Sequence, residues 1–464
     1  MLKIEQKPIL KEIVSILEKA KQQNKKYISI VEKVNHIHPV NFFAKFNETE
    51  YERYFWKEFD HSVTFVGIGV EKEFIVKDGS NRYNLMKSMW EDFLKDVYIN
   101  DQIRWTGPLI MGGFSFFDID EHSDKWSKYP QGKMILPKVL LSVLDDGTSY
   151  LTYNFMINEN TSAGTLISFI ENIYNQIQIE GQLSAETNEI ENKVSKDYSE
   201  WEQLIDDAVN VIKEGKLGKV VLARELEVFF KEKIDISNVI KRLYEQQLDS
   251  YVFAIEHDGD VFLGATPERL VKVSGNELLS TCLAGTISRG QTKEEDVKLA
   301  SNLLNDEKNR QEHQYVVDMI RQAIEPYCEQ IQIPIEPTIY KLRSLQHLYT
   351  PVTAVLKENY TIFNLVKDLH PTPALGGDPT ELAKDYIFEN EPFARGWYAA
   401  PIGWVDHQWN GEFAVAIRSA LVQKNKATLF AGCGIVKESN PKDEFEETNL
   451  KFTPMLEALG GTSE

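Results

Sequence analysis

Apolar and polar residues recur with two different periods along this chain, and the change between them predicts where helices and strands lie. Residues 8–24 and 164–179 carry apolar residues at helical spacing, which is typical of helices with one buried face. Between about 27 and 157 the apolar runs are short and of strand length, and turn-forming residues such as Asp146 and Gly147 separate them. This part of the chain is therefore expected to be rich in strands.

The second half of the chain alternates strands with helices. The expected order is a helix at 199–215, a strand at 219–230, a helix at 237–248, a hairpin at 251–265, a strand pair at 269–283, a long helix at 292–326, strands at 411–423 and 427–436, and a closing helix from 441. Strands that are joined both by hairpins and by helices predict a mixed α/β or α+β architecture.

One polar stretch interrupts this order. Residues 180–196 (EGQLSAETNEIENKVSK) have little apolar periodicity, so we expect a linker or an exposed loop there. The stretch separates an N-terminal region, 1–195, from a C-terminal region, 196–464.

Charge and cysteine content narrow the classes of function. The formal net charge of −20, from 51 basic and 71 acidic residues, argues against non-specific nucleic-acid binding, which needs a positive field. The three cysteines form no CxxC pair, which indicates a reducing compartment. Neither a signal peptide nor an apolar run of about 18 residues is evident, so we expect a cytoplasmic protein without a membrane span.

Two carboxylates stand out in the closing helix. Asn440 suits its N-cap, and Glu444, Glu447 and Lys451 share one helical face beside an apolar stripe. A buried carboxylate needs a cation, a proton or several donors. The residues alone favour a simpler interpretation, a solvated Glu447–Lys451 pair that contributes a few tenths of a kcal/mol, on the order of 0.3.

A third carboxylate lies in the long helix. Glu312 shares a face with Val316 and Ile320, whereas His313 points away from that face. Two helices that both supply carboxylate oxygens would suit a hard cation such as Mg²⁺, which prefers one or two carboxylates together with water and substrate oxygens. Zinc is not expected, because no Cys/His cluster has metal-ligand spacing.

Cationic residues and glycines supply further candidates. Arg418 stands in an otherwise apolar strand and calls either for a bidentate anion or for a structural Arg–Glu pair; the residues do not decide between these. The glycines of LAGT (283–286), LGGDP (375–379) and AGCG (431–434) allow close approach to a ligand, although phosphate-loop spacing is absent. Physical arguments alone do not select Lys219 or Glu268 as functional residues.

Together these segments resemble the chorismate-utilising enzymes, the family of anthranilate synthase component I. The matching motifs occur in the family's order between about 199 and 456: KVVLAR, GATPERL, LAGTISRG, EKNRQEH, LHPTPALGG, RGWYAAPIGW, AVAIR, LFAGCGIV and SNPKDEFEETNLK. This resemblance reverses the preference for a solvated Glu447.

Within the family, HPTPA (370–374) and the Leu283-Ala284 pair resemble the water-using branch, and the long N-terminal region resembles the isochorismate synthases of menaquinone biosynthesis. The resemblance therefore implies Mg²⁺-dependent conversion of chorismate to isochorismate by water addition at C2 with loss of the C4 hydroxyl. The alternatives are a salicylate synthase, a siderophore-pathway isochorismate synthase and, less expected, a non-catalytic chorismate-binding homologue. No obligatory protein partner is implied, and the chain would act as a monomer or homodimer.

The family's roles transfer to matching positions. Lys219 would be the general base and Glu268 the general acid. Glu312 and Glu447 would ligate Mg²⁺, with Glu444 nearby. The implied substrate-binding positions are Gly285, Thr286, His347, Ala374, Tyr398, Arg418, Gly432, Gly434 and Lys451.

The resemblance also implies a fold and some departures from it. The expected fold is α+β, a layered αββα arrangement of two packed antiparallel sheets, to which region 1–195 contributes strands and helices. Three positions differ from the family's usual residues: Asn309, Phe445 and Cys433. Asn309 stands where relatives often have an acid that helps to organise the metal, so the resemblance implies weaker support of the metal ligands at this position.

Overall fold

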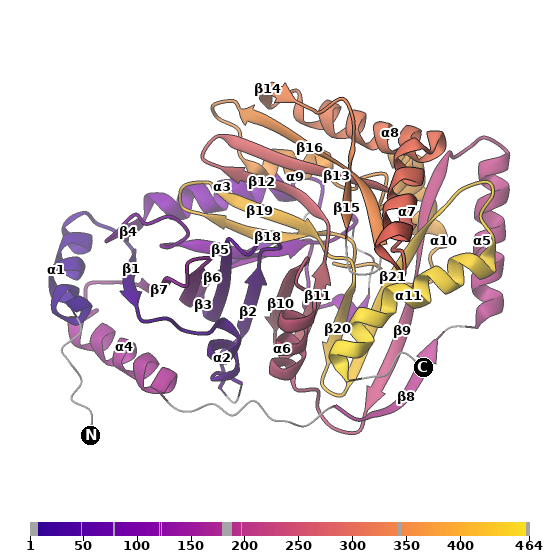
Figure 1. Cartoon of the computed structure of the whole chain (residues 1–464). Helices are drawn as coiled ribbons and strands as arrows, with labels where there is room; N and C mark the ends of the chain where they lie inside the picture. The colour runs from indigo at the N-terminus through magenta and orange to yellow at the C-terminus, as the bar shows by residue number, and fades with distance from the viewer. Residues whose placement is uncertain are drawn as a thin grey trace.

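The computed structural model describes residues 8–47, 49–77, 79–119, 121, 123–178, 188–195, 197–341 and 345–460 (Figure 1). Residues 180–187 and 196 of the expected linker lie outside these ranges. Within them, β8 (Ile190–Ser195) forms a strand that pairs with residues 226–230. The expectation of a linker is wrong for this part, because an exposed edge strand can form through backbone pairing without an apolar face.

Most strands belong to a first sheet. Its order is β4–β1–β7–β6–β3–β2–β10–β11–β20–β21–β9, with β8 and β17 both beside β9, and every pairing except β1–β4 is antiparallel. The bounds are β1 Tyr27–Val34, β2 Arg53–Lys57, β3 Val63–Val76, β4 Val97–Ile99, β6 Gly132–Leu144, β7 Ser149–Met156, β9 Lys219–Phe230, β10 Tyr251–His257, β11 Asp260–Thr266, β17 Gly377–Asp378, β20 Ser419–Gln423 and β21 Lys426–Ile435.

A second sheet continues from β3 and β6 in the order β6–β5–β18–β19–β12–β13–β16, with β14 and β15 beside β16. Its further strands are β5 Leu109–Phe114, β12 Arg269–Ser274, β13 Glu277–Ser288, β14 Cys328–Gln332, β15 Thr338–Lys341, β16 Leu345–Leu356, β18 Pro401–Asp406 and β19 Gly411–Val415. The register of β3 and β6 shifts between Val70 and Lys72, opposite Pro137. A bulge beside a residue without an N–H lets both strands bend from one sheet into the other.

Helices cover the outer faces of both sheets, as Figure 1 shows. The first sheet is covered by α1 Pro8–Gln22, α2 Pro39–Ala44, α4 Ala163–Gln178, α6 Ile236–Gln246 and α11 Pro441–Leu459, and the second by α3 Arg82–Lys95, α7 Lys293–Asn305, α8 Glu307–Ile324 and α9 Ile362–Leu369. α5 (Tyr198–Lys213) and α10 (Thr380–Asn390) lie against β9. A short 3₁₀ helix spans Asp124–Trp126.

The inner faces of the two sheets share one apolar core. Phe65 of β3 and Trp404 of β18 meet there edge to face, with ring centroids 4.9 Å apart. The predicted α+β class is confirmed, and the two packed sheets are joined through β3 and β6 rather than separate.

The expected long helix at 292–326 is two helices. Asp306 has a non-helical backbone, with φ −76° and ψ 113°, and ends α7 while capping α8. Its carboxylate accepts a hydrogen bond from the Asn309 N–H at 2.8 Å. An aspartate that satisfies free N–H groups favours a new helix start over continuation of the old helix.

The expected strand 411–423 is also divided. β19 ends at Val415 and pairs within the second sheet, whereas β20 begins at Ser419 and pairs within the first sheet. Residues 416–418 cross between the sheets, and Arg418 has a φ of +51°. Arg418 therefore lies at the junction of the two sheets. The prediction from the apolar run, that Arg418 lies inside a strand, is wrong.

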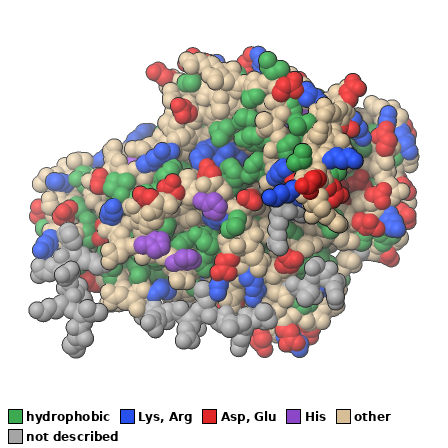
Figure 2. Space-filling view, viewed as in Figure 1, with side chains coloured by type: hydrophobic (Ala, Val, Ile, Leu, Met, Phe, Trp, Pro, Cys, Tyr) green, Lys and Arg blue, Asp and Glu red, His purple; other side chains and the backbone are tan. Residues whose placement is uncertain are grey.

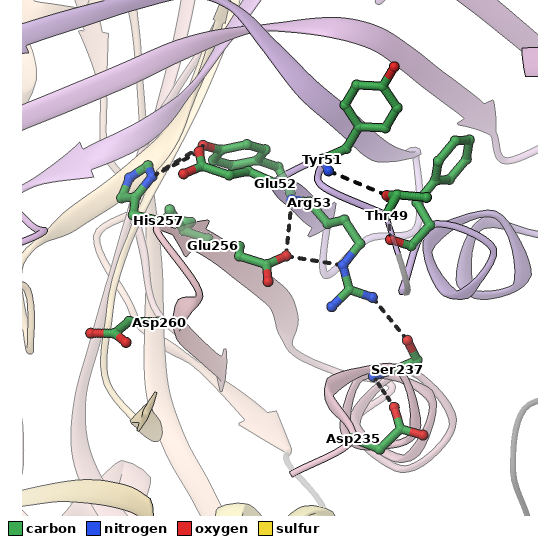
Figure 3. A network of polar contacts seen from close by, with 12 residues as sticks. Thr49, Tyr51, Glu52, Arg53, Asp235, Ser237, Glu256, His257 and Asp260 are labelled. Carbon is green, nitrogen blue, oxygen red and sulfur yellow. Dashed lines mark hydrogen bonds and ion pairs between the residues drawn. The ribbon is translucent and has the colours of Figure 1, made fainter. Parts of the chain in front are cut away.

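A polar network ties the N-terminal region to the C-terminal region between β2, β10 and α6 (Figure 3). Arg53 Nε donates to Glu256 Oε2 at 3.0 Å, and its NH1 donates to Ser237 Oγ at 3.1 Å. Asp235 caps α6 by accepting from the Ser237 N–H at 2.9 Å. Strands from both sides of residue 195 are thus hydrogen-bonded to one another.

The surface carries both signs of charge. On the face in Figure 2, acidic and basic side chains are interspersed over most elements. Among the described helices, none is both long and apolar enough to cross a membrane.

Candidate active site

Lys219 begins β9 beside the glycines of β21. Its strand pairs with β21 so that Gly434 lies opposite Val221. A Cβ on Gly434 would come within 2.7 Å of Lys219 Cε, so glycine makes room for the lysine side chain. Burial lowers the pKa of Lys219 and Lys451 lowers it further, while Glu312, Glu447 and Glu268 oppose this shift.

Glu268 lies between β11 and β12, where its backbone is fixed on both sides. Its N–H donates to Thr266 Oγ1 at 3.3 Å, and its carbonyl accepts from the Val415 N–H at 3.2 Å. Burial raises the pKa of Glu268 to about 7, although the positive charges of Lys451, Lys219 and Arg418 act in the opposite direction. The carboxyl therefore keeps a proton up to much higher pH than an exposed glutamate does.

Arg418 brings a positive charge to the same place. Its carbonyl accepts from the Ala265 N–H at 3.1 Å, which fixes the crossing segment beside β11. Its guanidinium is only partly exposed and makes no hydrogen bond or ion pair with any residue that the structure describes. The structural Arg–Glu pair is thus not formed, and the guanidinium is free to bind an anion.

α11 contributes a carboxylate, a lysine and a close backbone contact. Lys451 Nζ donates to Glu447 Oε1 at 2.6 Å and to the Gly432 carbonyl at 2.8 Å. The expected i,i+4 pair is present, and Glu447 keeps about half of its side chain, 51%, exposed. Because Lys451 also reaches β21, the pair is fixed to the sheet rather than solvated at random.

Glu444 and Tyr398 both lie near this contact. Burial raises the pKa of Glu444, which hydrogen-bonds Ser439 and Cys433. A Cβ on Gly432 would lie 3.0 Å from the Tyr398 hydroxyl, and the Tyr398 ring stacks on Phe430 with centroids 5.2 Å apart. Tyr398 is buried, and burial raises its pKa, so its hydroxyl stays a donor.

The α8 residues are arranged differently from the sequence expectation. Glu312 is exposed, although it is the carboxylate with the largest effect on Lys219. His313 faces the second sheet and is buried, with Nε2 2.7 Å from Thr350 Oγ1 and Nδ1 3.1 Å from the Ala284 carbonyl. The expectation that Glu312 lies inward and His313 outward is wrong. The buried face of α8 is rotated about the helix axis relative to the predicted face, so that it includes His313 and leaves Glu312 exposed.

The second sheet supplies a bulge and a paired histidine. Gly285 has a φ of +76° at a register shift between Ala284 and Thr286, and a Cβ there would lie 3.2 Å from Asn309 Oδ1. Thr286 Oγ1 and His347 Nδ1 are 2.9 Å apart. Burial, Arg418 and Lys451 lower the pKa of His347 to about 4, so its ring is neutral.

Sequence reasoning did not single out Arg395, which fixes the segment around Ala374. The buried guanidinium donates to the Leu375 carbonyl at 3.1 Å and to the Val221 carbonyl at 2.8 Å, and it pairs with the buried Glu391. The segment thereby lies against β9, and Ala374 is partly buried beside it. An arginine at the start of the largely apolar run RGWYAAPIGW was the available signal.

The carboxylates suit a hard cation by chemistry. Glu312, Glu447 and Glu444 offer oxygen donors only, the type that Mg²⁺ prefers. In the described part of the chain, no three His, Cys, Asp or Glu side chains are close enough to form a metal centre by themselves. Mg²⁺ commonly takes one or two protein carboxylates and completes its shell with substrate and water oxygens.

Known proteins with similar sequences are chorismate-binding enzymes. The sequence family described as chorismate binding enzyme matches residues 12–460. The isochorismate synthase MenF of Bacillus subtilis is 41% identical over 98% of this chain and 98% of that protein. The salicylate biosynthesis isochorismate synthase of Pseudomonas aeruginosa is 34% identical over 93% of this chain and 90% of that protein.

Solved structures share the fold. MenF, the menaquinone-specific isochorismate synthase from Escherichia coli, superposes with a TM-score of 0.79 at 24% identity, over 97% of this chain and 99% of that chain. Anthranilate synthase component I from Streptococcus pneumoniae superposes with a TM-score of 0.68 at 19% identity, over 92% of each chain. The expected anthranilate synthase component I-like fold is thus confirmed.

Proposed function

The chain belongs to the family of chorismate-binding enzymes, and from this premise we propose that it is an isochorismate synthase that serves menaquinone biosynthesis. The observation that carries the proposal is the full-length likeness to the MenF enzyme of Bacillus subtilis. The proposed reaction converts chorismate to isochorismate, with one water consumed at C2 and one released from C4.

Lys219 is the proposed general base. A lysine accepts a proton only in its neutral form, and burial together with Lys451 lowers the pKa of Lys219 toward that form. Neutral Nζ takes one proton from the attacking water, whose oxygen forms the new bond to ring C2. The room that Gly434 leaves beside the lysine allows its Nζ to approach the reacting water.

Glu268 is the proposed general acid. With a pKa of about 7, its carboxyl gives a proton to the C4 hydroxyl, which departs as water when the C4–O bond breaks. As the C2–O bond forms, the C1=C2 electron pair moves to C1–C6 and the C5=C6 pair moves to C4–C5, which breaks the C4–O bond. Lys219 gains one proton and Glu268 loses one, so atoms, electrons and charge balance. The reverse reaction uses the same two groups in opposite protonation states.

Cations and hydrogen-bond donors hold the substrate in this proposal. Arg418 has no partner among the described residues and is suited to a substrate carboxylate. The Tyr398 hydroxyl, Lys451 and the backbone around Gly285, Gly432 and Gly434 complete the anion-binding surface. Thr286, His347 and Ala374 line the remaining walls.

We propose Mg²⁺ as the cofactor, held by Glu312 and Glu447 with Glu444 nearby. When bound, the ion would offset the repulsion between these carboxylates and the substrate's ring carboxylate. Lys451 pairs with Glu447, so this lysine is placed to exchange one anionic partner for another when substrate binds.

The cysteines bear on the compartment in which the enzyme would act. The three cysteines are buried and free, which supports a cytoplasmic enzyme in a reducing compartment. The proposal needs no obligatory protein partner, because base, acid and anion-binding groups all come from one chain, and the enzyme would act as a monomer or homodimer.

A product assay tests this function. Purified protein incubated with chorismate and Mg²⁺ should give isochorismate, identified by chromatography against a standard, and EDTA should abolish the conversion. Stoichiometric pyruvate and salicylate without added lyase would instead identify a salicylate synthase. Full activity in EDTA would contradict the Mg²⁺ proposal, and no turnover under any condition would favour a non-catalytic homologue.

A further inference from the structure

α8 is attached to the second sheet by one face. Val316, Val317, Ile320 and Ile324 are buried in that interface, and His313 joins them through its bonds to β13 and β16. The helix therefore follows the second sheet. Lys219, in contrast, belongs to β9 of the first sheet.

A second face of α8 points toward β9. Glu312 and Tyr315 lie three residues apart and thus on one side of the helix, and both are exposed. The Tyr315 hydroxyl donates a hydrogen bond to Asp378 Oδ1. This bond joins a helix of the second sheet to a strand of the first sheet.

Asp378 is the residue paired with Lys219. β17 and β9 are antiparallel, with Asp378 opposite Lys219, and the Gly218 N–H donates to the Asp378 carbonyl at 2.8 Å. A Cβ on Gly218 would lie 3.3 Å from Asp378 Oδ2, so the carboxylate sits directly against the start of β9.

We propose that Tyr315 and Asp378 are positioning residues whose hydrogen bond holds α8, and with it Glu312, against the strand end that carries Lys219. The role of Glu312 in Mg²⁺ binding rests on the proposed function; the mechanical role of the bond does not. Without the bond, α8 keeps its attachment to the second sheet, but the turn that carries Glu312 moves more freely relative to Lys219.

The chain contains a matched control. The Tyr327 hydroxyl donates to Asp368 Oδ2, joining the turn that follows α8 to α9. This bond also links a tyrosine to an aspartate near the surface. The pKa of each tyrosine is raised to about 12, chiefly by the hydrogen bond in Tyr315 and chiefly by burial in Tyr327. It lies within the second-sheet layer and does not reach β9.

The first experiment needs neither substrate nor metal. Amide hydrogen exchange in peptides that cover 309–318 should speed up about 3- to 10-fold in Tyr315→Phe, the range that corresponds to loss of one hydrogen bond. Asp378→Ala should act alike, and the double variant should exchange no faster than either single variant. Tyr327→Phe should leave this segment at the wild-type rate.

The second experiment separates positioning from general stability. In Tyr315→Phe, the Mg²⁺ concentration for half-maximal turnover should rise about 3- to 10-fold, and kcat at saturating Mg²⁺ should change less. Unchanged exchange at 309–318 in Tyr315→Phe would overturn the inference even if the enzyme makes isochorismate. Faster exchange would uphold the mechanical role even if the wild-type protein makes a different product.

Discussion

At the scale of single residues, the site depends on a carboxyl that burial keeps partly protonated. Three positive side chains, Lys451, Lys219 and Arg418, favour ionisation of Glu268, yet its pKa lies at about 7. Desolvation therefore exceeds the combined attraction of these charges. A group in this state can donate a proton at neutral pH, which an exposed glutamate cannot.

Glu268→Gln should separate catalysis from stability. The variant cannot donate a proton, so kcat should fall about 100-fold or more. The folded-state pKa of about 7 exceeds the unfolded value near 4.5, so the wild type loses stability as pH rises from about 4.5 to about 7, and the loss is complete above that range. Urea unfolding should show the variant more stable than wild type at pH 8, by about 1 to 3 kcal/mol, and much less so at pH 5. An equal difference at both pH values would contradict the assignment.

Lys219→Ala should abolish turnover while chorismate still binds. The variant lacks the proposed base, so kcat should fall about 1,000-fold, whereas Arg418 and the other proposed anion-binding groups remain. Titration calorimetry with chorismate should give a Kd within about 5-fold of wild type. Lys216→Ala, a change at the exposed lysine nearby, should leave kcat unaltered. Unaltered kcat in Lys219→Ala would remove this residue from the mechanism.

The individual site residues were only partly predictable from the sequence. Physical patterns located Glu447 and Arg418 as charges beside apolar residues, but Lys219 and Glu268 entered only through the family resemblance. Burial decides their pKa values, and burial depends on β21 and β19, which are distant in sequence. The prediction of which α8 face is buried was wrong. A rotation of the helix by a few tens of degrees is enough to bury His313 and to expose Glu312.

At the scale of elements, β21 is a regular strand that contains two glycines facing other side chains of the site. Gly432 and Gly434 both lie on the length of β21 that pairs with β9, and their lack of a Cβ leaves room for Tyr398 and Lys219. A glycine inside a strand lowers its stability, so its presence indicates a close approach by another group.

Gly434→Ala should impair catalysis more than folding. The added methyl group would meet Lys219 Cε at 2.7 Å and displace the lysine from its position. We expect kcat/KM to fall at least about 10-fold, with a change in Tm of only a few degrees. Gly164→Ala in α4, where the nearest atom lies 3.7 Å away, is the matched control and should retain full activity. Wild-type kcat/KM in Gly434→Ala would show that Lys219 does not need this space.

Element boundaries followed the sequence where local signals were strong. The strand 219–230 and the closing helix from Pro441 are as expected, because apolar patterning and an Asn440 cap define them. The break at Asp306 and the crossing at 416–418 were not foreseen. At both places the local sequence is compatible with continuing the helix or the strand. The break arises because the residues that follow make their contacts with other parts of the fold.

At the scale of the whole molecule, the two sheets are joined by the bent strands β3 and β6 and by the network around Arg53. The candidate site residues come from both sheets: Lys219 from the first, Gly285 from the second, and Arg418 from the segment between them. The family resemblance predicted this layered arrangement, whereas apolar patterning alone gave only the class.

Arg53→Ala should destabilise the whole chain. Glu256, whose side chain is 16% exposed, would lose its ion-pair partner in a largely buried place. We expect the free energy of unfolding to fall by about 2 to 4 kcal/mol. Urea titration followed by fluorescence and circular dichroism would measure this. Lys26→Ala, at an exposed ion pair, should leave the free energy of unfolding unchanged. A loss no larger than that of Lys26→Ala would show that the Arg53 network does not join the two regions.

The origin of the new hydroxyl oxygen tests the central claim most directly. The enzyme would be incubated with chorismate and Mg²⁺ in H₂¹⁸O, and the product would be analysed early in the reaction by mass spectrometry and NMR. Water attack at C2 predicts isochorismate with a single ¹⁸O, located in its C2 hydroxyl. Unlabelled isochorismate would mean that the C4 hydroxyl migrates within the substrate, and this result would contradict the assignment of Lys219 as the base that activates water.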